Sequence, residues 1–226
     1  MSGGTMSSNT MILIGMYDSP FTRRVAIALA LLGYAFEHRS WSVGADFDRI
    51  RGYSPLGRVP VLVLDDGQVL TESAAILDWL EHGPGGGSLL PAGGDERREA
   101  MRLIGLASGA ADRCVAGVLE RIFHPPQHRS EALLARGRIQ VEGALAALDD
   151  ACAARGGHWL VGDAMTLADI TVACYATYAG QSLPVELSQW PALAAHVARC
   201  EALDVFAAHY APFFVPQPKG TKESNA

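Results

Sequence analysis

Hydrophobic and polar positions change their period several times over roughly the first eighty residues. The apolar run MILIGMY ends just before Ser19 and is typical of a buried strand, and the segment Pro20 to Leu32 that follows is typical of a helix. Ser19 is placed to cap this helix, Pro20 stands at its first position, and Gly33 lies just past its end. The chain therefore begins with a predicted strand, a tight turn and a helix.

The segments that follow predict a small α/β unit. YAFEHRSW alternates like a second strand, and GADFDRIRGYSPLG indicates a short helix or an irregular loop. VPVLVL and QVL, joined by DDG, predict two strands with a tight turn, and ESAAILDWLEHG predicts an amphipathic helix ended by Gly83. The order β-α-β-α-β-β-α over residues 11–83 predicts an α/β layer with a mixed sheet.

The spacing of apolar residues in the second half of the chain is typical of helices throughout. Residues 84–94 have the glycine and proline content of a linker, and residues 95–212 predict an all-helical domain. Its first long helix carries apolar residues at three- and four-residue steps, namely Leu103, Ala107, Ala110, Cys114 and Val118. Further helices are expected from Glu131 to Arg155, after LVGDAM, and from Pro191. Residues 1–10 and 213–226 are expected to be flexible termini.

Composition excludes several classes of protein. Of the 226 residues, 49% are hydrophobic and 19% are charged, which is the balance of a globular chain. The net charge is -6 and neither half is strongly basic, so nucleic acid is not an expected partner. No apolar run approaches the ~20 residues of a membrane span, and the first ten residues do not have the pattern of a secretory signal. We expect a cytoplasmic protein.

Cysteine and histidine spacing predicts neither a disulfide framework nor a metal site. All four cysteines lie far apart in the second half, with no C-x-x-C pair, which favours buried free thiols. His124 and His128 flank PPQ, whose prolines make a loop and not one helix face.

The turn SPFT carries the first candidate chemistry. A helix N-terminus presents unpaired N–H groups and a partial positive charge, which stabilise a thiolate. Here the turn holds hydroxyls and no sulfur, so a thiolate on a ligand could accept a hydrogen bond from Ser19. Such a charge-assisted bond is worth ~1.5–3 kcal/mol. The alternative is that Ser19 is only a helix cap.

Two later stretches could hold the rest of such a ligand. A cis Val59-Pro60 bond would leave the Val59 N–H and C=O free to pair with an extended peptide, whereas a trans proline entering an edge strand is the commoner arrangement. Glu72 and Ser73 begin a predicted helix, where a carboxylate and an ammonium could be bound. Simple helix capping is the alternative there.

Together, SPFT, RVPVL and TESAAILDWLE, in this order and spacing, resemble the glutathione transferase superfamily. The resemblance covers Met11 to about Pro212 and is greatest to serine-type enzymes of bacteria and plants, such as the tau-like group. GDAMTLADITVA also resembles the family's internal helix cap, in which Thr166 and Asp169 would form a capping box. The family fold is a thioredoxin-like domain followed by an all-helical domain.

The resemblance implies glutathione as co-substrate, with no metal. Ser19 would activate the glutathione sulfur as the catalytic residue. The other glutathione-binding residues would be Arg58, Val59, Pro60, Glu72 and Ser73. Arg58 lies where related enzymes often carry a basic residue for a carboxylate, although a solvated surface arginine is equally compatible with the sequence.

Two other hydroxyls compete with Ser19 for the sulfur. Tyr17 ends the strand, and tyrosine activates glutathione in other classes, but a strand aromatic packed on the second domain is the alternative. Thr22 is the second rival. The first domain has no cysteine, which argues against the cysteine-type classes, and the missing SSC opening argues against the maleylacetoacetate isomerase group.

The implied reaction is conjugation of the glutathione thiolate to a small hydrophobic electrophile, as in detoxification, or a related isomerisation, dehalogenation or peroxide reduction. The electrophile would lie between the domains, against a helix that carries Ser108, Asp112, Arg113 and Cys114. The small residues of GLASGAA could leave room for it or allow close helix packing. A non-catalytic binding or regulatory protein, similar to the stringent starvation proteins, is the alternative. A homodimer is expected.

Overall fold

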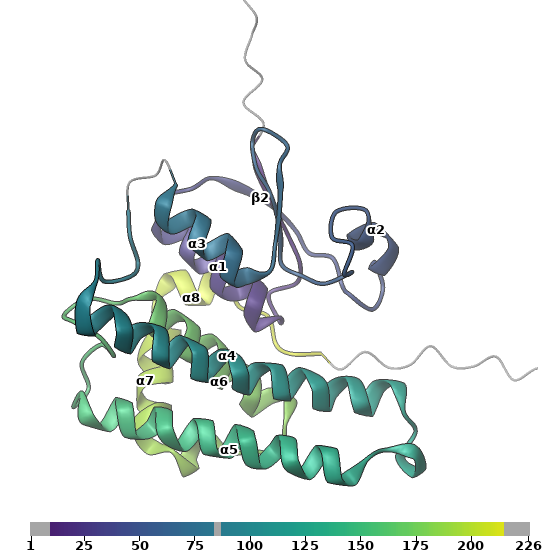
Figure 1. Ribbon diagram of the computed structural model, residues 1–226, viewed down its shortest axis with the longest axis vertical. Helices are drawn as coiled ribbons and strands as arrows, with labels where there is room; N and C mark the ends of the chain where they lie inside the picture. Colours follow the sequence, from purple (N-terminus) through teal and green to yellow (C-terminus); the bar gives the residue numbers. More distant parts are fainter. Residues whose placement is uncertain (1–9, 84–86, 215–226) are drawn as a thin grey trace, which may run out of the picture.

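The computed structural model of the protein describes residues 10–83 and 87–214 (Figure 1). Its first part has the predicted order β-α-β-α-β-β-α, and GADFDRIRGYSPLG contains a short helix. The elements are β1 (Met11–Ile14), α1 (Pro20–Leu31), β2 (Phe36–Arg39), α2 (Phe47–Arg51), β3 (Val61–Val63), β4 (Val69–Thr71) and α3 (Ser73–His82).

The four strands form one mixed sheet in the order β2-β1-β3-β4. β1 pairs with β2 in parallel and with β3 in antiparallel orientation, and β3 pairs with β4 in antiparallel orientation. Successive side chains point to opposite faces. Leu13 and Leu62 join the core that contains α1 and α3, whereas Ile14 and Val61 pack with Ile50 of α2. The predicted α/β layer is confirmed.

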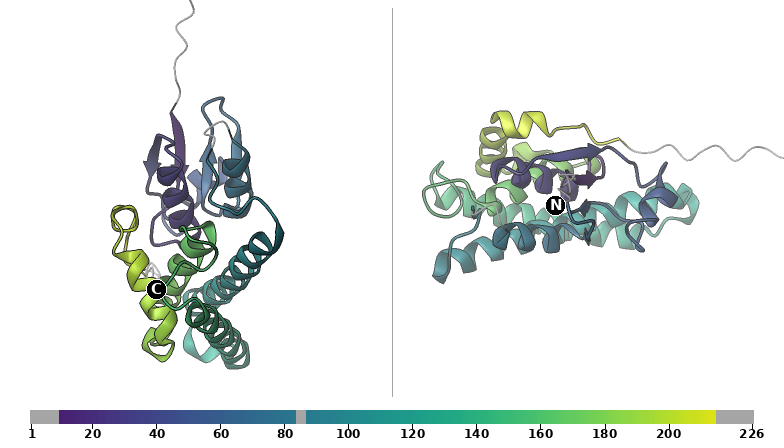
Figure 2. Two further views of the ribbon diagram at one scale, coloured as in Figure 1. Left: turned by 90° about the vertical axis from the view of Figure 1, so that its left-hand side faces the viewer. Right: turned by 90° about the horizontal axis from the view of Figure 1, so that it is seen from above.

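The second part is entirely helical, as predicted (Figure 2). Its helices are α4 (Gly94–Phe123), α5 (Glu131–Ala154), α6 (Leu167–Ser182), α7 (Pro191–Glu201) and α8 (Asp204–Ala208), with 3-10 turns η1 (Pro126–His128) and η2 (Leu187–Gln189). The helix α8 was not predicted, because five residues are too few to show a period. None of the helices that the structure describes is both long and apolar enough to span a bilayer.

Several boundary expectations fall partly outside the described residues. The expected flexible termini include residues 1–9 and 215–226, and the expected linker includes residues 84–86, none of which the structure describes. α4 begins at Gly94, the last residue of the expected linker. The capping box at α6 is present: the Asp169 carboxylate accepts the Thr166 N–H at 2.8 Å.

Two helices of the helical part are joined by a buried histidine. His196 of α7 is 1% exposed, and its Nε2 lies 3.6 Å from Oδ1 of Asp169 in α6. Arg199 Nη2 lies 2.9 Å from His196 Nδ1. A guanidinium can only donate, so Nδ1 must accept and the imidazole is neutral. Burial lowers the pKa of His196; the Asp169 carboxylate opposes this shift and the Arg199 charge adds to it, so that the net pKa is lowered.

We therefore expect the protein to lose stability in mild acid through His196. The unfolded chain binds a proton near the ordinary histidine pKa of about 6.5, whereas the folded protein binds it only at lower pH. Between these two values, stability falls as pH falls, by up to about 1.4 kcal/mol per pH unit. Urea unfolding at pH 7.5 and 5.5 should show a smaller loss for His196→Gln than for the wild type. The exposed His82, replaced by glutamine, is the control and should behave like the wild type; an equal loss in all three proteins would contradict the expectation.

Candidate functional site

The sheet brings three predicted ligand-binding segments to one edge. Ile14 is opposite Val61, and Val61 is opposite Thr71, so these residues form a row across β1, β3 and β4. β1 ends at this row, β3 begins near it, and β4 ends at it. The turn after β1, the loop before β3 and the start of α3 therefore lie side by side.

The row also sets the size of a ligand. Neighbouring strands lie about 4.8 Å apart, so β1 and β4 are separated by about 10 Å. An extended peptide rises about 3.4 Å per residue, so three residues cover this distance. Ser19 follows one end of the row and Glu72 the other, with Val59 between them. The edge can hold an extended tripeptide.

Ser19 is the N-cap of α1 and is half-buried. Its Oγ accepts the Thr22 N–H at 3.4 Å, which is long for a capping bond. A capping serine uses an oxygen lone pair and keeps its O–H proton as a donor. The cap and the sulfur donor are therefore compatible roles for one hydroxyl.

The bond between Val59 and Pro60 is cis. Of the two arrangements considered from the sequence, the structure therefore has the rarer cis bond and not the commoner trans bond. Val59 is half-buried, and neither its N–H nor its C=O makes a hydrogen bond to a residue that the structure describes. These two groups are available to an extended ligand beside β3.

The start of α3 has the geometry of an anion site and not of a capped helix. Glu72 has φ 67°, a region that residues other than glycine rarely adopt, and it makes no side-chain cap. Ser73 is buried, and its hydroxyl also caps nothing; Oγ instead accepts Arg24 Nη2 at 2.7 Å and Nε at 3.2 Å. The first N–H groups of α3 are thus left for a ligand.

Arg58 is on the surface near this helix start. Its side chain is about half exposed, and Nη1 lies 3.7 Å from Oε1 of Glu72. Arg58 is thus a solvated surface arginine next to one of the predicted glutathione-binding residues.

The two rival hydroxyls have surroundings that favour Ser19. Tyr17 stacks on His38 with ring centroids 3.9 Å apart and meets His209 of the second part edge-on at 5.3 Å. Burial raises the pKa of Tyr17, which disfavours the phenolate. Thr22 is fully buried. Its hydroxyl lies so close to the backbone of Gly15 that a Cβ added there would come within 2.5 Å of Thr22 Oγ1. This burial makes Thr22 a poor donor to a ligand.

The candidate residues of α4 point in different directions. Ser108 is half-buried and near the Tyr175 hydroxyl, whereas Asp112 and Arg113 are exposed. Cys114 is fully buried, and burial raises its pKa to about 11, so this thiol does not face a ligand as a nucleophile. Of the four, only Ser108 lies beside the buried groups behind α3.

The glycines of GLASGAA do not serve close helix packing. A Cβ added at Gly105 or Gly109 would meet no atom within 4 Å. Buried alanines of the same helix, namely Ala107, Ala110 and Ala111, supply the packing. The expectation of close packing therefore holds for the alanines and is wrong for the glycines.

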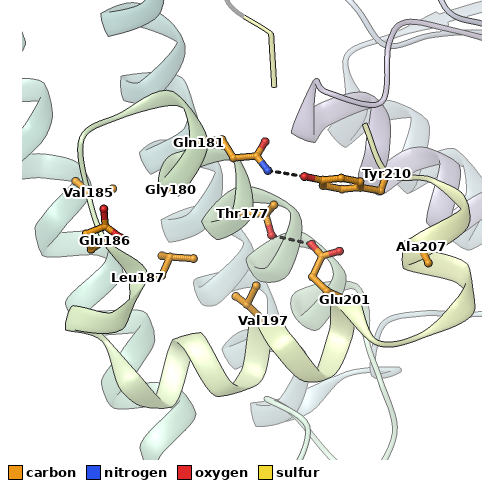
Figure 3. Close-up of a pocket in the computed structure, with 10 residues that line it drawn as sticks. All are labelled: Thr177, Gly180, Gln181, Val185, Glu186, Leu187, Val197, Glu201, Ala207 and Tyr210. Atoms are coloured by element: carbon orange, nitrogen blue, oxygen red, sulfur yellow. Dashed lines mark hydrogen bonds between the residues drawn. The ribbon is translucent and has the colours of Figure 1, made fainter. Parts of the chain in front are cut away.

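A pocket of about 630 Å³ lies elsewhere, between α6, η2, α7 and α8 (Figure 3). Leu187 and Val197 form part of its apolar wall, and Glu201, Thr177 and Tyr210 form its polar side. Because the glutathione-binding candidates do not line it, the pocket is separate from the sheet edge.

One buried side chain at the sheet edge was missed by the sequence analysis. Arg24 of α1 is 3% exposed and donates a hydrogen bond to Ser73. None of the sequence motifs connected Arg24 with Ser73. The signal was the pair of arginines in the otherwise apolar RRVAIALALL, since charged residues inside such a helix are rarely buried without a partner.

Comparison with known proteins identifies both parts of the chain. Residues 13–88 match the family model described as "Glutathione S-transferase, N-terminal domain", and residues 111–204 match "Glutathione S-transferase, C-terminal domain". The solved glutathione S-transferase of Methylobacterium radiotolerans JCM 2831, in complex with glutathione sulfonate, is 32% identical with a TM-score of 0.83. The match covers 95% of this chain and 98% of that one.

Curated relatives match over most of their length. The uncharacterized GST-like protein YibF of Escherichia coli K12 is 31% identical over 74% of this chain and 81% of its own. Maleylacetoacetate isomerase of Rhizobium meliloti is 30% identical over 88% of this chain and 95% of its own.

Proposed function

Because the chain belongs to the glutathione S-transferase superfamily, we propose that it is a glutathione-dependent enzyme whose site is the edge formed by β1, β3 and β4. One observation carries the proposal: this edge presents two helix N-termini and an unpaired backbone segment over the length of an extended tripeptide. The similarity to a structure with bound glutathione sulfonate supports the same ligand.

Each part of glutathione would meet a matching group. The Ser19 hydroxyl would donate to the sulfur, and the backbone of Val59 would pair with the cysteinyl residue beside Pro60. At the other end, Glu72 would accept from the ammonium, and Ser73 with the first N–H groups of α3 would hold the α-carboxylate. Arg58, which lies on the surface, would attract a carboxylate of the ligand.

The preferred reaction is conjugation to a small hydrophobic electrophile. The thiolate forms a bond to an electrophilic carbon, and a leaving group departs with the electrons of its own bond. A hydrogen bond of ~1.5–3 kcal/mol from Ser19 would lower the pKa of the bound thiol by roughly one to two. At pH 7, a thiol whose ordinary pKa is about 8.5 would then be ionised to roughly a quarter at the smaller shift and roughly three quarters at the larger one, instead of about 3%.

A second candidate reaction is glutathione-dependent isomerisation, which the similarity to maleylacetoacetate isomerase supports. The thiolate would add to a cis double bond conjugated to a carbonyl, whose electrons move to the carbonyl oxygen. Rotation about the new single bond and loss of the thiolate would give the trans isomer. Glutathione is regenerated, whereas conjugation consumes it. The sequence lacks the SSC opening of that group, so we rank this candidate second.

The family resemblance supports the remaining parts of the proposal. Residues 11–83 would bind glutathione, and residues 95–212 would provide the electrophile site. The enzyme would be a cytoplasmic homodimer, and sedimentation should give twice the mass of the chain.

Glutathione consumption distinguishes the candidates. We expect the protein to bind glutathione and, with chlorodinitrobenzene, to consume one glutathione per conjugate. With maleylacetoacetate, isomerisation would give product without loss of glutathione. Binding without turnover of either probe would favour the non-catalytic alternative, and failure to bind glutathione would refute the proposal.

A further inference from the structure

The pocket between α6, η2, α7 and α8 is not used by the proposed function (Figure 3). Its volume of about 630 Å³ is in the range of sites for small organic molecules. Val185, Leu187 and Val197 give it an apolar wall, and both valines are buried, so they present a fixed surface. A ligand would gain affinity by covering this wall. The pocket therefore has the volume and the apolar surface of a binding site.

The charge that the pocket leaves uncompensated is negative. Two of its ten lining residues are acidic, Glu186 and Glu201, and none of the ten is a lysine or an arginine. Arg23 neutralises Glu201 through two bonds of 2.7 and 2.6 Å, but this arginine is 2% exposed and does not line the pocket. Glu186 is exposed and forms no ion pair with any residue in 10–83 or 87–214. A cationic group of a ligand is therefore favoured at Glu186 and not at Glu201.

At Glu201 the pocket offers acceptors to an uncharged donor. Oε1 of Glu201 already accepts from Arg23 and from the Thr177 hydroxyl, which lies 2.7 Å away. Within the described chain, Oε2 accepts from Arg23 alone, so it keeps a lone pair, and the side chain is 25% exposed. Thr177 gives its proton to Glu201 and thus keeps only acceptor capacity. A second cation here would be repelled by Arg23, whereas a hydroxyl carries no charge.

The two acidic side chains are separated by the apolar wall. Figure 3 shows Leu187 and Val197 between the side chains of Glu186 and Glu201. Elsewhere on the polar side, Gln181 Nε2 donates to the Tyr210 hydroxyl at 2.8 Å, so these two groups bond to each other. A ligand that matches the pocket has three parts in line, namely a cation, an apolar body and an uncharged donor.

We propose that this pocket is a second ligand site, which binds a small amine with an apolar body and a hydroxyl at its far end. The ammonium would pair with Glu186, the body would cover Leu187 and Val197, and the hydroxyl would donate to Oε2 of Glu201. Glutathione does not match this site, because Glu186 would repel its carboxylates. The inference does not depend on the sheet-edge site, since none of the predicted glutathione-binding residues lines the pocket.

Tyramine is the probe, since it has an ammonium, an aromatic body and a phenolic hydroxyl. Three analogues change one part each: tyrosol has a hydroxyl in place of the ammonium, phenethylamine lacks the phenolic hydroxyl, and 3-(4-hydroxyphenyl)propanoate has a carboxylate in place of the ammonium. In calorimetric titrations, tyramine should bind about three- to fivefold more tightly than tyrosol or phenethylamine. The carboxylate should bind more weakly than tyrosol. An excess of glutathione should leave the affinity for tyramine unchanged.

A matched pair of variants tests the position of the site. Glu186→Gln and Glu142→Gln remove the same charge, but Glu142 is on the surface of α5 and does not line the pocket. We expect Glu186→Gln to weaken tyramine binding about three- to fivefold and to change tyrosol binding by less than about twofold. Glu142→Gln should leave both affinities unchanged.

Four results would overturn the inference. Equal affinities of the wild type for tyramine, tyrosol and the carboxylate would show that the pocket does not select a cation. An equal loss in Glu186→Gln and Glu142→Gln would mean that only the net charge of the protein matters. Displacement of tyramine by glutathione would place the amine at the sheet edge. A wild type that binds none of the four compounds has no such site.

Discussion

Replacing Ser19 with alanine is expected to lower kcat/KM for glutathione conjugation about 10- to 100-fold at neutral pH. The serine hydroxyl is the donor available at the N-terminus of α1 that combines partial exposure with a free proton. Its loss would remove ~1.5–3 kcal/mol of thiolate stabilisation. The absorbance of the bound thiolate, followed against pH, should show a higher thiol pKa in the variant.

The pH profile separates this role from damage to the fold. Above the ordinary thiol pKa of about 8.5, glutathione ionises without help, so the defect of Ser19→Ala should shrink as pH rises. Tyr17→Phe is the matched control, since it removes a hydroxyl but keeps the ring that stacks on His38, and it should keep nearly full activity. Equal thiolate titrations in the wild type and Ser19→Ala, with a loss in Tyr17→Phe, would transfer the role to Tyr17.

The second large expected effect is a loss of stability when the ion pair between Arg23 and Glu201 is broken. Glu201→Ala is expected to lower the free energy of unfolding by about 3 kcal/mol, the lower end for a broken buried pair because Glu201 is partly exposed. The cost arises because Arg23 would remain buried without its carboxylate. Glu201 also accepts the Thr177 hydroxyl at 2.7 Å, seen at the edge of the pocket in Figure 3. Urea denaturation measures the change.

An exposed ion pair provides the control for this variant. Arg138 Nε lies 2.6 Å from Oε1 of Glu142 on the surface of α5. Removing it by Glu142→Ala should cost only about 0.3–0.5 kcal/mol. Similar costs for the two variants would show that the pair between α1 and α7 does not hold the two parts of the protein together.

Local patterns predicted the fold because each element is marked by its own residues. The alternation in the strands, Pro20 and Pro191 at helix starts, and the Thr166 cap all lie within the element that they specify. The predicted positions of Ser19 and Glu72 follow from the same local signals, since both precede a helix.

Long-range partners could not be predicted in this way. The isomer at Val59-Pro60 depends on packing around the loop, whereas sequence frequencies favour trans. Arg23 pairs with the carboxylate of Glu201, which is 178 positions away in the chain. The sequence around either residue contains no signal that predicts this pair. For the same reason, the sequence did not distinguish Arg23, which pairs with a carboxylate, from Arg24, which donates to a hydroxyl.

The surroundings of the cysteines have a consequence for an enzyme that handles electrophiles. All four thiols are buried, and burial raises their pKa, to about 11 for Cys114 and about 12 for Cys152 and Cys174. Alkylation requires an accessible thiolate. The protein thus keeps its own thiols away from the compounds it would process, and the thiolate of the ligand is the one that can react with them. Such an enzyme can survive many turnovers without being modified by its own substrates.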